Sequence, residues 1–365
     1  MRVRHIVRQY EPSVGGLETF VHKLAHSLND LGCESDVLTL NRILAGGTQR
    51  LPMRERVNGI DVERVPMVGH RRLFAPVIPA SALRGYDVLH VHGIDGMFER
   101  VARQPRDRAQ LRVATSHGLF FHTPWMAGVK KLYFSTITRL AASRYDCLIG
   151  NSAADEERLL TLGPPVVQIP NGVAPLGDFT AGGRDLLCLG RLSSHKRVDR
   201  LIAMMALPPL DGVTLHIVGP TWDVPIDSLR AQTQALGITE RVQIHGHVAP
   251  ATLAAIAARC GLIVSASEYE GFGMSLIEAM SVGLIPVVEP NLSFRQLIGN
   301  ASVGALISFQ NPANAAIGVA AILARIDPEM RQRARAVATV YSWARNAAAT
   351  TTLYAALREQ RQTLS

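Results

Sequence analysis

The stretch Glu270-Gly-Phe-Gly-Met-Ser-Leu-Ile-Glu278 holds two carboxylates, with seven residues between them, around a glycine-containing turn. The preceding residues 261–267 are mostly small or apolar and predict a short buried strand, and residues 275–280 have the spacing of a helix. Backbone N–H groups near Gly273 and Met274 would face a ligand at the start of that helix, where the helix dipole adds partial positive charge. A strand, a tight turn and a helix N-terminus hold diphosphates in α/β proteins, so the stretch predicts an α/β fold with a phosphate site.

The two glutamates of this stretch have different expected positions. Glu270 lies in the turn, where its carboxylate can reach a sugar hydroxyl. Glu278 lies about one turn into the helix, where it could accept two hydrogen bonds from a ribose diol. A second interpretation stays open from these residues alone, in which one glutamate lies near a helix start because of the dipole and the other lies on a solvated face.

Length and composition indicate a globular α/β protein. The chain has 365 residues, 47% of them hydrophobic and 30 of them glycine, and two domains of roughly 150–180 residues are expected. No apolar run approaches the ~18–20 residues that cross a bilayer. Residues 1–8 alternate charged and apolar side chains and lack a signal-peptide core, so we expect a cytoplasmic protein. The four cysteines form no CxxC pair and predict free thiols in a reducing compartment.

Positive charge is concentrated in the first half of the chain. The net charge is +8, and residues 1–170 hold 22 basic and 16 acidic side chains, a difference of +6. Such a surface favours a phosphorylated acceptor, an anionic lipid or a nucleic acid. Nothing in the chain resembles a DNA- or RNA-binding module, so we expect no nucleic-acid partner.

The chain alternates strand-like runs with helical patterns, which is typical of parallel sheets flanked by helices. One series of strands is expected over residues 2–8, 35–40, 60–65, 88–91, 113–116 and 147–150, and a second over 186–189, 214–218, 242–245, 262–265 and 285–288. A turn-rich segment, 164–177, separates them, and the pattern from Ala334 to Arg361 is helical, with Trp343 and Tyr354 as packing residues. We therefore expect domains over 1–170 and 171–340, a ligand cleft between them, and a C-terminal helix over 341–365.

Further motifs follow predicted strands. Gly15-Gly16 opens an amphipathic helix over residues 17–31, and His117 follows the strand 113–116. Arg191 and Lys196 lie on one loop, where a guanidinium fork and an ammonium point charge could grip a diphosphate. Alone, these residues also fit a plain turn, a structural histidine and a solvated basic loop.

Taken in order, seven motifs resemble those of glycosyltransferase family 4. They are Gly15-Gly-Leu-Glu18, Ser116-His-Gly118, Asn151-Ser152, Pro170-Asn-Gly-Val173, Gly190-Arg-Leu192 with Lys196, Ile217-Val-Gly219, and Glu270 with Glu278. The resemblance covers nearly the whole chain and implies a GT-B fold: two Rossmann-like domains facing across a cleft, with a C-terminal helix that packs back toward the N-terminal domain. It also implies a hexosyltransferase that retains the anomeric configuration.

The resemblance implies a role for each residue at a matching position. Arg191 and Lys196 would bind the donor diphosphate, Glu278 the ribose, and Glu270, with His117 from the other domain, would meet the transferred sugar. The remaining donor contacts are expected from Gly16, Gly190, Gly219, Val248, Gly271, Phe272, Gly273, Met274 and Leu276. No Asp-x-Asp occurs, so no metal ion is expected, and cations and helix N-termini would neutralise the leaving group.

A narrower resemblance concerns bacterial exopolysaccharide mannosyltransferases. It rests on residues 196–202, Pro220-Thr-Trp222 and residues 267–273, and it implies GDP-mannose as the donor and a polyprenyl-diphosphate-linked oligosaccharide as the acceptor. One departure is that residues 286–294 lack the glycine pair that often follows the Pro-Val-Val strand in this family.

Residues 119–134 mix bulky apolar side chains with two lysines. Phe121, Trp125, Lys130 and Lys131 form a candidate surface for the anionic inner membrane that would carry a lipid-linked saccharide. Core packing with a solvated lysine pair is the alternative interpretation.

Other functions remain open on the same scaffold. A sugar-nucleotide epimerase or hydrolase would need carboxylates placed for proton transfer, and no second acidic pair lies near His117. A non-catalytic sensor is disfavoured by the intact cations and glutamates. A transferase that uses a UDP-sugar and another acceptor is a further alternative.

Overall fold

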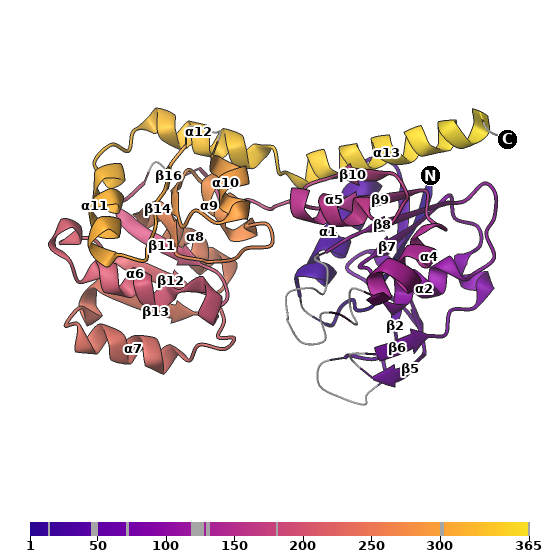
Figure 1. Cartoon of the computed structure of the whole chain (residues 1–365), viewed down its shortest axis with the longest axis horizontal. Helices are drawn as coiled ribbons and strands as arrows, with labels where there is room; N and C mark the ends of the chain where they lie inside the picture. Colours follow the sequence, from indigo (N-terminus) through magenta and orange to yellow (C-terminus); the bar gives the residue numbers. More distant parts are fainter. Residues whose placement is uncertain are drawn as a thin grey trace. The chain divides into compact units, whose positions relative to one another are not determined.

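The computed structural model describes residues 1–13, 15–44, 50–70, 73–117, 128, 132–179, 182–299 and 303–363. These residues form two compact units. The N-terminal unit contains residues 1–172 together with the C-terminal segment 343–365, and the C-terminal unit contains residues 173–342. Each unit is a sheet of mainly parallel strands with its own hydrophobic core, which confirms the expected α/β class (Figure 1).

The N-terminal sheet has the strand order β10-β9-β8-β7-β1-β2-β4-β3, and all of its pairings are parallel except β3 with β4. Its strands are β1 (Arg2–Val7), β2 (Glu34–Leu40), β3 (Arg54–Val57), β4 (Ile60–Val65), β7 (Val88–His92), β8 (Leu111–Thr115), β9 (Cys147–Gly150) and β10 (Val166–Gln168). A separate hairpin joins β5 (Met67–His70) and β6 (Leu73–Pro76). The strand order reverses direction between β1 and β7, the position where open α/β sheets bind ligands.

Helices cover both faces of this sheet, so its central strands are buried on both sides. They are α1 (Gly16–Asp30), α2 (Gly96–Ala102), α4 (Arg139–Ala142), α5 (Ala153–Leu160) and α13 (Trp343–Thr363), with short turns η1 (Ala80–Leu83) and η3 (Phe134–Thr138). One core contains Phe98 of α2 and Leu159 of α5, and the other contains Phe20 of α1 and Tyr354 of α13. Alternate strand residues supply the two cores, as parallel strands between two helical layers require.

The C-terminal helix α13 belongs to the N-terminal unit, where it packs against α1 (Figure 1). Tyr354 is fully buried, and Trp343 packs against the same core, as predicted. The expectation of one helical stretch from Ala334 to Arg361 is wrong, because the chain forms α12 (Pro328–Thr339) and α13 with a break between them. At the break the Tyr341 carbonyl accepts a hydrogen bond from Val173 N at 2.7 Å, where the two connecting segments of the chain meet.

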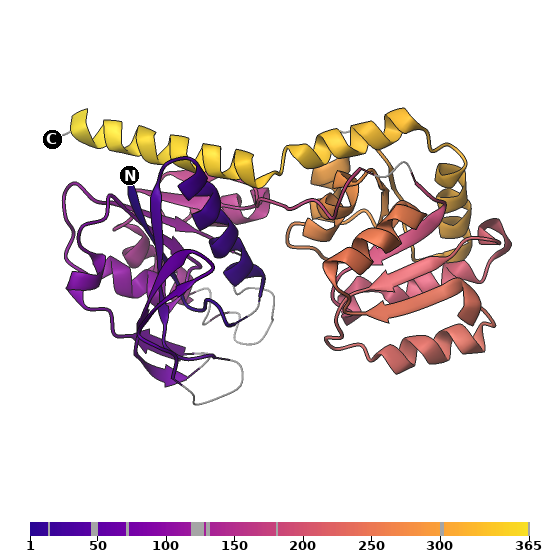
Figure 2. The same cartoon turned by 180° about the vertical axis from the view of Figure 1, so that it is seen from behind.

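The C-terminal sheet is entirely parallel, with the order β13-β12-β11-β14-β15-β16. Its strands are β11 (Asp185–Leu189), β12 (Leu215–Val218), β13 (Val242–Gly246), β14 (Cys260–Ser265), β15 (Ile285–Val288) and β16 (Ala305–Leu306). Helices cover both faces (Figure 2): α6 (Val198–Met205), α7 (Ile226–Ala235), α8 (Pro250–Arg259), α9 (Met274–Ser281), α10 (Leu292–Ile298), α11 (Pro312–Leu323) and α12, with short turns η4 (Ser194–Lys196), η5 (Pro208–Leu210) and η6 (Thr239–Arg241). Here the strand order reverses between β11 and β14.

Two expectations from composition are met. Cys33, Cys147, Cys188 and Cys260 are free thiols. Among the helices that the structure describes, none is both long and apolar enough to span a bilayer.

Candidate active site

The residues predicted to bind the donor diphosphate and the transferred sugar lie after β11 and β14, at the reversal point of the C-terminal sheet. Arg191 follows β11, and Glu270 follows β14, its direct neighbour. The loops after these two strands are also joined to each other, because Glu268 N donates to the His195 carbonyl at 2.9 Å. The sheet therefore brings together two segments that lie far apart in the sequence, in the crevice where this kind of sheet binds ligands.

An ion pair between Lys196 and Glu270 connects the two loops. Lys196 Nζ donates to Glu270 Oε1 at 2.5 Å, and their side chains retain only 17% and 11% of their exposure. Ser293 Oγ donates to the Glu270 carbonyl at 2.6 Å and holds the turn from the other side. The basic group predicted for the diphosphate and the acidic group predicted for the sugar are thus in direct contact.

Glycines make room around this pair. Gly219 has φ +151°, and a Cβ on it would lie 1.8 Å from the Gly190 carbonyl oxygen, so no other residue fits there. A Cβ on Gly190 would lie 3.7 Å from Lys196 Nζ and 3.9 Å from Ser275 Oγ. Gly190 therefore lies between the lysine and the start of α9, where a larger side chain would occupy space next to both.

Gly273, which has φ +92°, is the N-cap residue of α9 and has no side chain to cap the helix. The first backbone N–H groups of α9, on Met274 and Ser275, therefore lack a side-chain cap and remain available to an anion. Ser275 was not singled out from the sequence, although its place in the first turn after a glycine was a usable signal.

Arg191 is exposed and has no carboxylate partner among the described residues. Its guanidinium carbon lies 4.9 Å from the centre of the Trp222 ring, in cation–π geometry. Trp222 is itself 66% exposed. The sequence motif Pro220-Thr-Trp222 contains this tryptophan but predicts no role for it. The backbone bridge between Leu192 and Thr221 brings the neighbouring Arg191 and Trp222 together.

Glu278 lies in α9, and its carboxylate has no hydrogen-bond or ion-pair partner in the part of the chain that the structure describes. Burial raises the pKa of this carboxyl above its ordinary value. A part-buried carboxylate without a partner is costly in the free protein and would gain from two hydroxyl donors.

The other predicted donor residues of this unit are distributed around the same loops. Gly271 is exposed, and the Phe272 ring makes an edge contact with Tyr341 at 5.5 Å. Leu276 is 2% exposed and packs in the core, so only its backbone can face a ligand. Val248 is half-buried and follows β13.

The predicted residues of the N-terminal unit occupy equivalent strand ends. Gly16 is the first residue of α1, and a Cβ there would meet no atom within 4 Å. His117 follows β8, and the Phe20 ring of α1 packs edge-on against it at 4.5 Å. Burial lowers the pKa of His117 to about 3, so its imidazole is neutral. Phe121, Trp125, Lys130 and Lys131 lie outside the described residues.

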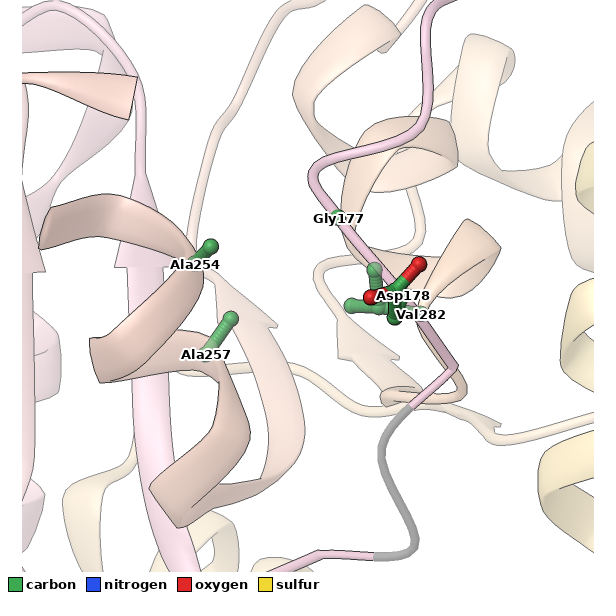
Figure 3. Close-up of a pocket in the computed structure, with 5 residues that line it drawn as sticks. All are labelled: Gly177, Asp178, Ala254, Ala257 and Val282. Carbon is green, nitrogen blue, oxygen red and sulfur yellow. The ribbon is translucent and has the colours of Figure 1, made fainter. Parts of the chain in front are cut away.

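Among the described residues, one group has metal-ligating side chains close enough to share an ion: His5, His90 and His92, all buried in the N-terminal unit. A small hollow in the C-terminal unit is lined by Gly177, Asp178, Ala254, Ala257 and Val282 (Figure 3). None of the residues predicted to bind the donor lines it.

Comparison with known proteins gives two matching families. Residues 15–172 match the glycosyl transferase 4-like domain, and residues 179–339 match glycosyl transferases group 1. A GDP-mannose:cellobiosyl-diphosphopolyprenol alpha-mannosyltransferase from Komagataeibacter xylinus is 33% identical over 361 residues, which cover 94% of this chain and 90% of the relative. This chain belongs to glycosyltransferase family 4. A Xanthomonas campestris protein of the same name is 30% identical to this glycosyltransferase, covering 94% and 93% of the two chains.

Solved structures confirm the GT-B fold of this glycosyltransferase. Sucrose-phosphate synthase from Thermosynechococcus elongatus matches with a TM-score of 0.72 at 19% identity, over 98% of this chain and 99% of the other. Anabaena HepE in complex with UDP matches with a TM-score of 0.73 at 18% identity, over 98% and 100%. The resemblance inferred from the seven motifs is therefore correct for family, fold and enzyme class.

Proposed function

We propose that this enzyme transfers mannose from GDP-mannose to a saccharide carried on polyprenyl diphosphate, with retention of configuration, in exopolysaccharide assembly. The observation that carries the transferase chemistry is the convergence of Lys196, Glu270 and the start of α9 at the reversal point of the C-terminal sheet. The donor and acceptor are supported by the names of relatives about 30–33% identical over 94% of the chain.

The donor diphosphate would replace Glu270 as the partner of Lys196. Arg191, which is exposed and lacks a carboxylate partner among the described residues, adds a second cation, and the first N–H groups of α9 add hydrogen-bond donors. Together they stabilise the negative charge that develops on the leaving diphosphate. Lys196 would thereby release the Glu270 carboxylate toward the hydroxyls of the transferred sugar.

The ribose would be held by Glu278. Its carboxylate has no partner among the described residues, and the two hydroxyls of a ribose diol satisfy both of its oxygens. This contact binds the donor equally in the ground state and the transition state, so it acts mainly on affinity.

Retention would follow from attack on the face that the diphosphate leaves. The acceptor hydroxyl forms the new bond to the anomeric carbon while the bond to the donor phosphate breaks, and a donor phosphate oxygen takes the hydroxyl proton. Glu270 as a covalent nucleophile is the alternative, as in retaining glycosidases. It is disfavoured because the family resemblance places this carboxylate beside the hydroxyls of the transferred sugar. Trapping a glycosyl adduct on Glu270 would show instead that this carboxylate is the nucleophile.

A lipid-linked acceptor requires the enzyme to reach the membrane surface. At the end of the predicted membrane segment and just after it, Leu132, Ile137 of η3 and Leu140 of α4 are exposed at 64%, 41% and 74%. Arg139 and Arg144 are exposed in the same segment. Apolar side chains with flanking cations fit the interface of an anionic bilayer, which supports peripheral contact through this surface.

The direct test is product formation from purified enzyme with cellobiosyl-diphosphopolyprenol, comparing GDP-mannose with UDP-glucose and UDP-galactose. We expect one added hexose from GDP-mannose, in the alpha configuration. Transfer from a UDP-sugar alone would correct the donor, and free sugar or an epimer formed without acceptor would favour a hydrolase or epimerase instead.

A further inference from the structure

The N-terminal unit holds a chain of hydrogen-bonded histidines across the reversal point of its sheet. His5 of β1 lies opposite His90 of β7 in the parallel register, and His92 follows two residues later on the same face. His5, His90 and His92 are at most 1% exposed. The chain ends at His117, the residue expected to meet the transferred sugar.

With the Asn151 amide turned so that Nδ2 faces His117, the hydrogen bonds imply one proton position on each ring. Asn151 Nδ2 donates to His117 Nδ1 across 3.4 Å. A neutral imidazole has one N–H, so His117 carries it on Nε2 and donates it to His92 Nδ1 at 3.2 Å. His92 donates in turn from Nε2 to His5 Nδ1 at 2.9 Å. The His5 proton is then on Nε2, a buried atom without a partner.

The rings are neutral, because burial lowers the pKa of His5 to about 3 and those of His90 and His92 well below the ordinary value. A metal ion would have to displace these bonds. It would bring positive charge into the core, where the group that could hold it contains three histidines and no carboxylate. His90 is also engaged, with Tyr354 Oη and Thr115 Oγ1, each at 2.6 Å.

An apolar core needs none of these imidazoles, and the unpaired Nε2 of His5 lowers stability. The chain of bonds does, however, determine what His117 offers at its outer end. With Nε2–H committed to His92, the other nitrogen, Nδ1, is an acceptor whose bond to Asn151 is long at 3.4 Å. Asn151 keeps a second partner, because its Nδ2 also donates to Asn171 Oδ1. Asn151 is 4% exposed, so a substrate hydroxyl that reaches Nδ1 has to displace its amide group.

We propose that His92 is a positioning residue, which fixes His117 in the Nε2–H tautomer so that Nδ1 accepts a hydrogen bond from a hydroxyl of the transferred sugar. This inference rests on the proposed function and on the expectation, from the family resemblance, that His117 meets the transferred sugar. His5 supports it by accepting the proton of His92, which keeps the Nδ1 of His92 free as an acceptor. Phe20 holds the plane of the His117 ring from the side.

The test uses the full-length enzyme labelled with ¹⁵N-histidine, with the His117 signals assigned by His117→Gln. We expect a protonated Nε2 and an unprotonated Nδ1 on His117 at pH 7.5. His92→Leu should remove this preference and lower kcat about tenfold, the effect of losing one aligned hydrogen bond. His92→Asn, whose Oδ1 lies where Nδ1 was, should restore both.

His90→Leu is the matched control, since it removes an equally buried histidine from the same strand without touching His117. It should lower the melting temperature but leave the His117 tautomer and kcat within twofold. Equal losses of kcat in both leucine variants, or a wild-type His117 protonated on Nδ1, would overturn the proposal. So would a rise in melting temperature with Zn²⁺ that His92→Leu abolishes. If His117→Ala transfers sugar normally while the tautomer results hold, the sugar contact fails and the histidine chain stands.

Discussion

Replacing Lys196 by methionine removes the charge and keeps most of the side-chain length. Lys196 Nζ lies 2.5 Å from Glu270 Oε1, and the two side chains are 17% and 11% exposed, so the substitution leaves a largely buried carboxylate without its partner. Breaking a fully buried pair costs about 3–5 kcal/mol. Water still reaches both groups here, so we expect a loss of about 1–2 kcal/mol, which lowers the melting temperature of this unit by a few degrees.

The loss in turnover should be larger than the loss in stability. The lysine is one of the two cations proposed to bind the leaving diphosphate, and removing one such group costs roughly 3–4 kcal/mol, or about 10²–10³ in kcat. Initial rates over a range of GDP-mannose concentrations, together with thermal unfolding with and without GDP, separate the two effects.

Glu270→Gln combined with Lys196→Met provides the decisive comparison. The double variant has no unpaired charge, so it should regain much of the lost stability but none of the lost turnover. Arg200→Met is a matched control, because Arg200 of α6 is 16% exposed and its Nη2 lies 2.6 Å from Glu268 Oε1 in the loop after β14. It should lower stability slightly and leave kcat unchanged. Turnover of Lys196→Met within threefold of wild type would refute the diphosphate role.

Three further predictions concern other parts of the molecule. Glu278→Gln should raise the melting temperature of the free enzyme at pH 7.5, because the raised pKa of this carboxyl means that its ionised form is disfavoured in the fold, and it should weaken GDP binding about tenfold by calorimetry. Leu140→Asp should reduce co-sedimentation with anionic vesicles at low salt without changing turnover on a short-chain soluble acceptor, and unchanged co-sedimentation would remove this surface from the proposal. The N-terminal unit should lose stability in acid, because His5 and His117 have pKa values of about 3 in the fold against about 6.5 unfolded. The free energy of unfolding should be highest above pH 6.5 and fall by about 1 kcal/mol per histidine per pH unit below it. Unfolding in denaturant at pH 7 and at pH 5 would measure this loss.

The central strands could be predicted because strands buried on both faces read as continuous apolar runs. The expected ranges 147–150 and 285–288 coincide with β9 and β15, and the range 60–65, which mixes apolar and charged residues, coincides with β4 beside the sheet edge. Edge strand β3, with the sequence Arg-Glu-Arg-Val, has no such run, and β16 has only two residues. These elements form because a neighbouring strand offers hydrogen bonds, which is information that local sequence does not carry.

In the candidate site, too, local sequence predicts some features and contacts between distant strands decide the others. Chain order and motif spacing place Arg191, Lys196 and Glu270 after strands. Their meeting depends on β11 lying beside β14, which joins residues 74 positions apart. The histidines gave even less signal, since His90 and His92 look like ordinary strand residues until β1 pairs with β7 and brings His5 to them. Contacts across a reversal of strand order are the part of a site that sequence alone leaves undetermined.

The two points where strand order reverses differ in charge: one carries ionised side chains and the other carries neutral histidines. The proposed reaction would use both. After β11 and β14, Lys196 and Glu270 form an ion pair, which a charged diphosphate could exchange for a new partner. Between β1 and β7, the histidines lie in the core and stay neutral, because burial keeps protons off their rings. A protonated imidazole beside an oxocarbenium-like transition state would repel the charge that forms there, whereas a neutral acceptor orients a sugar hydroxyl without that penalty. Burial of the histidine chain would therefore keep His117 a neutral acceptor for a sugar hydroxyl near neutral pH.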